Sequence, residues 1–143
     1  MTMISRFEDW PRRLEAVLAE AEADRFEWGR NDCGLLVARA IEAMTGVDVA
    51  ANLRGYLTED GASASLHNYA GGGLLEVCER LADQWELEEV DRNLAQRGDA
   101  ALVSTIEGIA AGVIDLSGRH VALVSHKGLV RVPMRWAQRV WHV

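Results

Sequence analysis

The first of the two cysteines, Cys33, stands in a sequence that suits nucleophilic chemistry. It follows Asn31 and Asp32, either of which is a good helix N-cap, so Cys33 falls in the first turn of a predicted helix. A thiol there feels the positive end of the helix dipole and the free N–H groups, and both favour the reactive thiolate. The alternative is a small apolar residue at a helix start, because Cys33 also falls on the apolar stripe of that helix. As a nucleophile, Cys33 would need a histidine to take and return its proton.

The four histidines are the candidates for that base. His120 is the best of them, because it precedes Ala122 by two residues in a predicted strand and so shares its face. The competing interpretation of His120 is a surface histidine at a turn. We expect His126 at an exposed turn, and His67 and His142 are poor candidates from their positions in the chain. No two histidines stand at metal-ligand spacing, so we expect neither a metal site nor a cofactor.

Helices are expected in the first half of the chain. Apolar residues recur there at three- and four-residue steps, which is typical of amphipathic helices. Asp9 is expected to cap the first helix, and Gly46 should end the second. Cys78 lies on a regular helical stripe and is most simply a buried apolar residue. The expected helices cover about residues 10–24, 33–45, 60–68 and 74–85.

Short β-rich runs separated by turn residues make up the last third of the chain. Their short spacers favour antiparallel hairpins over parallel crossovers. The expected strands cover residues 100–103, 111–114, 121–124, 129–132 and 139–143. Helices followed by strands predict an α+β fold. We expect one domain over residues 1–143, with a helical part at 1–90 and a sheet part at 97–143.

Charge and composition exclude several classes of protein. The 143 residues carry a net charge of −7, which argues against nucleic acid as a partner. The charge is uneven, because residues 1–96 hold 9 basic and 19 acidic side chains whereas residues 97–143 hold 6 and 3. No apolar run approaches the roughly 20 residues of a membrane span, and no signal peptide is visible. We therefore expect a chain made in a cytoplasm.

The segment around Cys33 resembles the nucleophile motif of the NlpC/P60 cysteine peptidases, which cut peptidoglycan stem peptides. The resemblance rests on Asp32-Cys33-Gly34-Leu35-Leu36 and on Arg97-Gly98-Asp99, which is similar to the start of the first sheet strand of that family. It implies a papain-like NlpC/P60-type fold, in which N-terminal helices present the cysteine to an antiparallel sheet.

Over residues 26–143 the chain is more closely similar to a small branch of this superfamily associated with the tails of phages and gene transfer agents. The shared motifs are Trp28-Gly29, Thr45-Gly46-Val47-Asp48, Gly55-Tyr56, Gly128-Leu129 and Trp141. Proteins of that branch are typically encoded among tail-tip genes. The resemblance thus implies a place in the phage tail tip, and so in the virion.

Two expected catalytic positions depart from the family pattern. Ala110 stands where active relatives carry the catalytic histidine, and Ala122 stands where they carry the polar residue that orients it. Neither alanine can hold or transfer a proton. We therefore expect a chain whose catalysis is impaired.

Three hypotheses for function follow. The first is a structural tail-tip component that docks other tail-tip or hub proteins through an aromatic and arginine patch of Arg131, Arg135, Trp136, Arg139 and Trp141. A solvated final strand is the competing interpretation of that patch. The second hypothesis is an active peptidoglycan endopeptidase or amidase that uses Cys33 as nucleophile and His120 as a displaced base. The third is a small bacterial amidase or binding module of the same fold.

Overall fold

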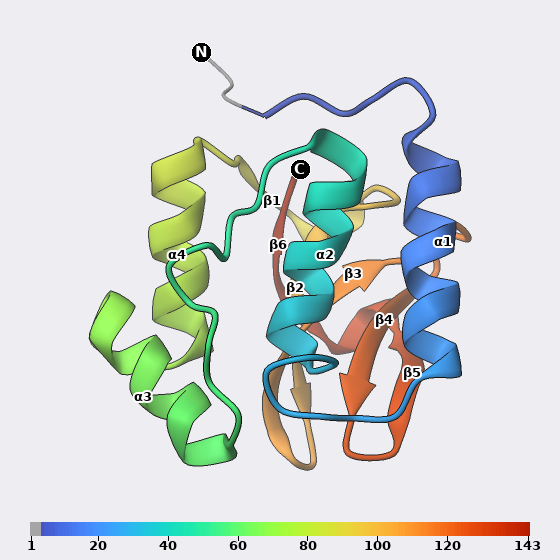
Figure 1. Cartoon of the computed structure of the whole chain (residues 1–143). Coiled ribbons are helices and arrows are strands. Elements are labelled where there is room, and N and C mark those ends of the chain that lie inside the picture. Colours follow the sequence, from blue (N-terminus) through green and yellow to red (C-terminus); the bar gives the residue numbers. More distant parts are fainter. Residues whose placement is uncertain (1–3) are drawn as a thin grey trace.

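The computed structural model describes residues 4–143 and places a layer of helices on one face of an antiparallel sheet (Figure 1). The helices are α1 (Trp10–Ala23), α2 (Cys33–Thr45), α3 (Glu59–Ala70) and α4 (Leu74–Trp85). The strands are β1 (Glu89–Val90), β2 (Ala100–Thr105), β3 (Gly108–Ile114), β4 (His120–Ser125), β5 (Gly128–Pro133) and β6 (Ala137–Trp141). Two short 3₁₀ turns, η1 (Arg92–Leu94) and η2 (Met134–Trp136), complete the fold. This confirms the predicted α+β class.

The ends of α2 are set by the residues that the sequence indicated. The Asp32 side chain accepts the N–H of Leu35 at 2.9 Å and so caps the helix. At the other end Gly46 takes a φ of +81°, the left-handed conformation that favours glycine. The expected side-chain cap of α1 is wrong, because the Asp9 carboxylate pairs instead with Arg12 and Arg13 one turn further on.

The sheet has the strand order β1-β6-β2-β3-β4-β5, and every pairing in it is antiparallel. Strands β2 to β5 form the predicted run of hairpins. The last strand, β6, then returns to lie beside β2, and the two-residue strand β1 pairs with it. Sequence reasoning missed β1, because two residues are too few to show an alternating pattern.

Both faces of the sheet are buried. The face toward α2 and α4 carries Ala111 and Val113 of β3, whereas the opposite face carries a second apolar cluster. That second cluster joins Val132 of β5 to Val140 of β6, although three strands lie between these two in the sheet. The sheet must therefore curl, and β5 leads into β6 through η2 alone.

The helical layer places α2 at its centre. Figure 1 shows α1 on one side of α2, α4 on the other, and α3 outside α4. The apolar stripes of α1 and α2 share one core cluster with the sheet. In the part of the chain that the structure describes, no helix has the length and apolar character that a membrane span requires.

Candidate functional site

Cys33, the first residue of α2, lies against the middle of the sheet. The backbone N–H groups of Ala111 in β3, of Gly34 and of Cys33 itself lie close enough to the Cys33 sulfur to lower the pKa of the thiol. The helix start thus supplies two of the backbone donors near this sulfur atom, and β3 supplies the third.

This environment nevertheless favours the thiol over the thiolate. Burial raises the pKa of Cys33, and the neighbouring Asp32 carboxylate raises it further, against the opposing effect of the hydrogen bonds from backbone N–H groups. The N–H groups at the helix start do lower the pKa of Cys33, as expected, but the effect of burial is larger, so the thiol is favoured overall. Burial also raises the pKa of Cys78, which packs beside Ala111 from α4, to about 12.

Asp32 and Tyr56 form the polar side of the site. One oxygen of the buried Asp32 carboxylate caps α2, and the other accepts the N–H of Gly29 at 3.0 Å and the hydroxyl of Tyr56 at 2.6 Å. Burial and the hydrogen bond to Asp32 raise the pKa of Tyr56, so its hydroxyl keeps its proton and acts as a donor. Sequence reasoning noted Tyr56 only as part of a motif and gave it no role at the site.

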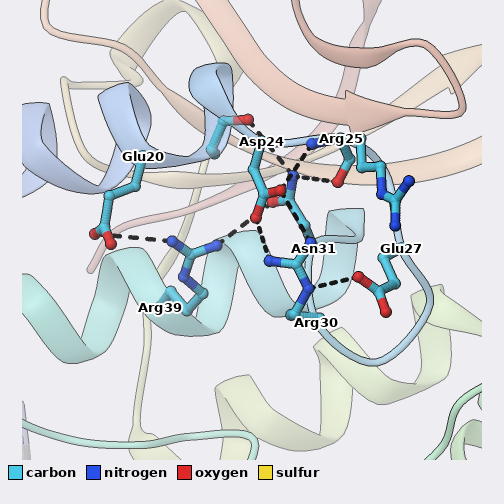
Figure 2. A network of polar contacts seen from close by, with 8 residues as sticks. Glu20, Asp24, Arg25, Glu27, Arg30, Asn31 and Arg39 are labelled. Carbon is cyan, nitrogen blue, oxygen red and sulfur yellow. Dashed lines mark hydrogen bonds and ion pairs between the residues drawn. The ribbon is translucent and has the colours of Figure 1, made fainter.

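A network of polar contacts fixes the loop that leads into α2 (Figure 2). Arg30 forms ion pairs with Asp24 and Glu27 across the loop. Within the loop, the side chain of Asn31 donates to the carbonyl of Arg25 at 3.0 Å, and Arg39 of α2 donates to the Asn31 side chain at 3.4 Å. These contacts hold the backbone in the position from which Asp32 caps the helix.

Gly29 completes this loop because no larger residue fits there. Its φ is +81°, and a Cβ built on it would lie 1.9 Å from the carbonyl oxygen of Tyr56. The close approach brings the backbone at Tyr56 against the loop, and so sets Tyr56 beside Asp32.

The residue that faces Cys33 from the sheet is Ala111, not Ala110. Ala110 packs into the apolar cluster on the opposite face of the sheet, since successive residues of a strand alternate between faces. The register that the resemblance implied is therefore off by one residue at this strand. Ala122 is fully buried on the face toward the helices. Alanine thus stands both at the position that the resemblance implied and at the position that faces the thiol.

His120 is exposed at the start of β4 and is not brought to Cys33. Its carbonyl accepts the N–H of Asp115, which lies four residues beyond Ala111 along β3. At about 3.3 Å per residue, His120 is displaced by roughly 13 Å along the sheet from the residue that contacts the thiol. Cys33 and His120 therefore do not form a nucleophile–base pair in this conformation.

His126 is the histidine that contacts the loop before α2. Its ring lies 4.6 Å from the ring of Phe26 and 6.1 Å from that of Trp28, measured between centroids. Nδ1 of His126 lies 3.4 Å from a carboxylate oxygen of Glu107 in the neighbouring hairpin. The side chain is 57% exposed, as expected for a residue at a turn.

His142 belongs to a separate cluster at the other end of α2. Its Nδ1 lies 2.9 Å from the buried carboxylate of Asp99, which also pairs with Arg6 at 3.0 Å. A Cβ at Gly98 would lie 3.0 Å from the sulfur of Met44, so this cluster sits where α2 ends. Met44 is eleven residues after Cys33, or roughly 16 Å along the helix. The cluster joins the N-terminal segment to the last strand and does not reach Cys33.

The side chains that were expected to form an aromatic and arginine patch do not share one surface. Trp141 is only 4% exposed and packs against the helices. Arg139 pairs with acidic side chains of β1 and α4, whereas Arg131 pairs with carboxylates at the end of β3 and on α1. Only Arg135 and Trp136, in η2, are exposed together. The predicted docking patch is therefore reduced to these two residues.

Among residues 4–143, no group of three or more His, Cys, Asp or Glu side chains is arranged to hold a metal ion.

Comparison with known proteins identifies the family of the chain. No curated protein is similar to the chain in sequence. The model of a family described as a domain of unknown function, DUF6950, matches residues 5–143. The chain therefore belongs to the DUF6950 family.

Proposed function

We propose that the chain is a non-catalytic domain with an NlpC/P60-like, papain-type fold, and that it serves as a structural component of a phage tail tip. The fold and the tail-tip location rest on the order of motifs shared with tail-associated relatives, from Trp28-Gly29 to Trp141. The loss of catalysis rests on the geometry around Cys33.

A single observation carries the non-catalytic part of the proposal: the Cys33 thiol faces an alanine. A cysteine hydrolase needs a base within about 3 Å of its nucleophile, or somewhat further before substrate binds. Here Ala111 occupies that position, and the contacts found for Cys33 within residues 4–143 involve no histidine. Burial also raises the pKa of Cys33, so the helix start alone does not supply a nucleophile.

The Asp32–Tyr56 pair gives the same segment a structural role. It joins the cap of α2, the loop at Gly29 and the segment before α3 through hydrogen bonds to one carboxylate. In this proposal the cysteine motif stabilises the fold. Asp32 contributes most through its hydrogen bonds, and Cys33 packs against Ala111.

Digestion of purified peptidoglycan tests the loss of catalysis. We expect the wild-type chain and Cys33→Ala to release equally few stem-peptide fragments, measured by chromatography and mass spectrometry. A known stem-peptide endopeptidase run in parallel shows that the substrate is cleavable. Fragment release by the wild type that Cys33→Ala abolishes would contradict the proposal and support the hydrolase alternative.

The location is tested on assembled particles. We expect mass spectrometry of purified tails to detect the chain in equal amounts whether it carries Cys33 or alanine, because assembly does not need the thiol. Tails that contain no copy of the chain would contradict the tail-tip assignment.

A further inference from the structure

A cavity of about 90 Å³ lies between the helical layer and the sheet. Its walls include Gly34 and Ala38 of α2, Val77 and Cys78 of α4, and Ala111 and Trp141 of the sheet. It adjoins the Asp32 site through Leu35 and Tyr56, but neither the proposed function nor the resemblance uses the space itself.

The cavity exists because small residues of one helix and of two neighbouring strands face one another there. Ala38 on α2 is 3% exposed and Ala111 on β3 is 4% exposed, and Ala100 of β2 also lines the space. Side chains of this size cannot fill the distance between a helix and a sheet, and the surrounding structure does not collapse onto them. The space is several times the roughly 10–15 Å³ that a single water needs.

Water has few partners in this cavity. Among its lining residues only Tyr56, Cys78 and Trp141 carry polar side-chain atoms, and the Trp141 indole offers a single N–H donor. The Tyr56 hydroxyl is already bonded to Asp32 at 2.6 Å, and a thiol is a weak donor. A buried water typically needs two to four polar partners, so an apolar guest suits the space better than water does.

The outer wall of the cavity includes α3, a helix that is largely exposed. Helix α3 contributes Leu66 to the lining, yet Ala62 is its one buried residue. Gly71-Gly72-Gly73 joins α3 to α4, and a Cβ added at Gly71 or Gly73 would meet no atom within 4 Å. Leu66, Tyr69 and Ala70 of α3 pack against the core from partly exposed positions, so a local displacement of this helix offers a route into the cavity.

We propose that the cavity is a binding site for a short aliphatic chain, such as the alkyl part of an alcohol, an acid or a lipid. An apolar cavity of about 150 Å³ is known to admit benzene, and this one is smaller, so a narrow chain fits it better than a ring.

A series of n-alkanols from butanol to octanol tests the proposal by NMR titration of the labelled protein. Burying one methylene lowers Kd about four-fold, so affinity should rise four-fold per carbon and then level off when the chain fills the cavity. Shifted amides should cluster on α2 and α4. Shifts that never saturate, shifts spread over the surface, or tighter binding of benzene than of any alkanol would overturn the proposal. A parallel titration with dihexanoyl phosphatidylcholine shows whether the cavity accepts an alkyl chain that belongs to a lipid or only that of a small free alcohol.

Two variants that fill the cavity provide the control. Ala38→Leu should abolish saturable binding, and Val77→Leu should weaken it if Ala38→Leu does not fold. Ala43→Leu makes the same change on α2 outside the cavity lining, and it should leave Kd unchanged. Equal binding by folded Ala38→Leu and Ala43→Leu would overturn the assignment of the ligand to this cavity.

Discussion

Replacing Asp32 by alanine should destabilise the fold severely, because one buried carboxylate satisfies three donors. The Asp32 side chain is 1% exposed and accepts hydrogen bonds from the N–H groups of Leu35 and Gly29 and from the Tyr56 hydroxyl. Alanine at this position leaves the start of α2 without a cap and two further polar groups without their acceptor.

The magnitude follows from these contacts. Loss of an N-cap costs about 1 kcal/mol, and loss of a hydrogen bond to a charged group costs about 1.5–3 kcal/mol. Since neighbouring losses do not add fully, we expect Asp32→Ala to lower the free energy of unfolding by about 3–5 kcal/mol. For a chain of this length that corresponds to a fall in Tm of roughly 10–15 °C.

Urea denaturation followed by circular dichroism measures this change. Asp60→Ala is the matched control, because it removes an exposed carboxylate from the first turn of α3 and should cost less than about 1 kcal/mol. Tyr56→Phe, which removes one of the three bonds, should fall between the two. An Asp32→Ala cost no larger than that of Asp60→Ala would refute the structural role given to Asp32.

The remaining predictions concern the thiols and the loop at Gly29. Because burial raises the pKa of both Cys33 and Cys78, the folded state holds protons that the unfolded thiols release above about pH 8.5. The contribution of the thiols to the free energy of unfolding should therefore not change below that pH. Above it, the free energy of unfolding should fall by up to about 1.4 kcal/mol per pH unit for each thiol. Denaturation at pH 8 to 10 checks this, and Cys78→Ala should show a smaller fall than the wild type; an identical fall would contradict the assignment. Gly29→Ala should cost more than about 2 kcal/mol in the same assay, since its Cβ would overlap a carbonyl oxygen and its φ is positive. Gly73→Ala, which has open space and a φ of −99°, should cost little; equal costs for the two variants would refute the steric argument.

Local signals predicted α2 and its cysteine well. The cap at Asp32 and the stop at Gly46 lie within a few residues of the helix they delimit, so they specify Cys33 as its first residue. The hairpins from β2 to β5 were likewise predictable, because each turn lies between the strands that it joins.

Contacts between residues far apart in the chain could not be predicted from the sequence patterns. Side chains of a strand alternate between the two faces of the sheet. An error of one residue at β3 therefore placed the expected catalytic position at Ala110, on the far face, instead of at Ala111, which faces Cys33. The pKa of Cys33 depends on burial by the sheet and by the helical layer, which no pattern near Cys33 describes. For the same reason the spacing of Arg131, Arg139 and Trp141 did not reveal that their side chains face different elements.

The pH dependence of Cys33 alkylation tests the central claim most directly. In a Cys78→Ala background Cys33 is the only thiol, and its reaction with iodoacetamide can be followed by intact mass from pH 5 to 10. Because burial raises the pKa of Cys33, we expect the rate to keep rising past about pH 9 without a plateau. A rate that levels off with a midpoint below about pH 7 would show a thiolate of the kind that cysteine peptidases use, and would contradict the claim that this site has lost its chemistry.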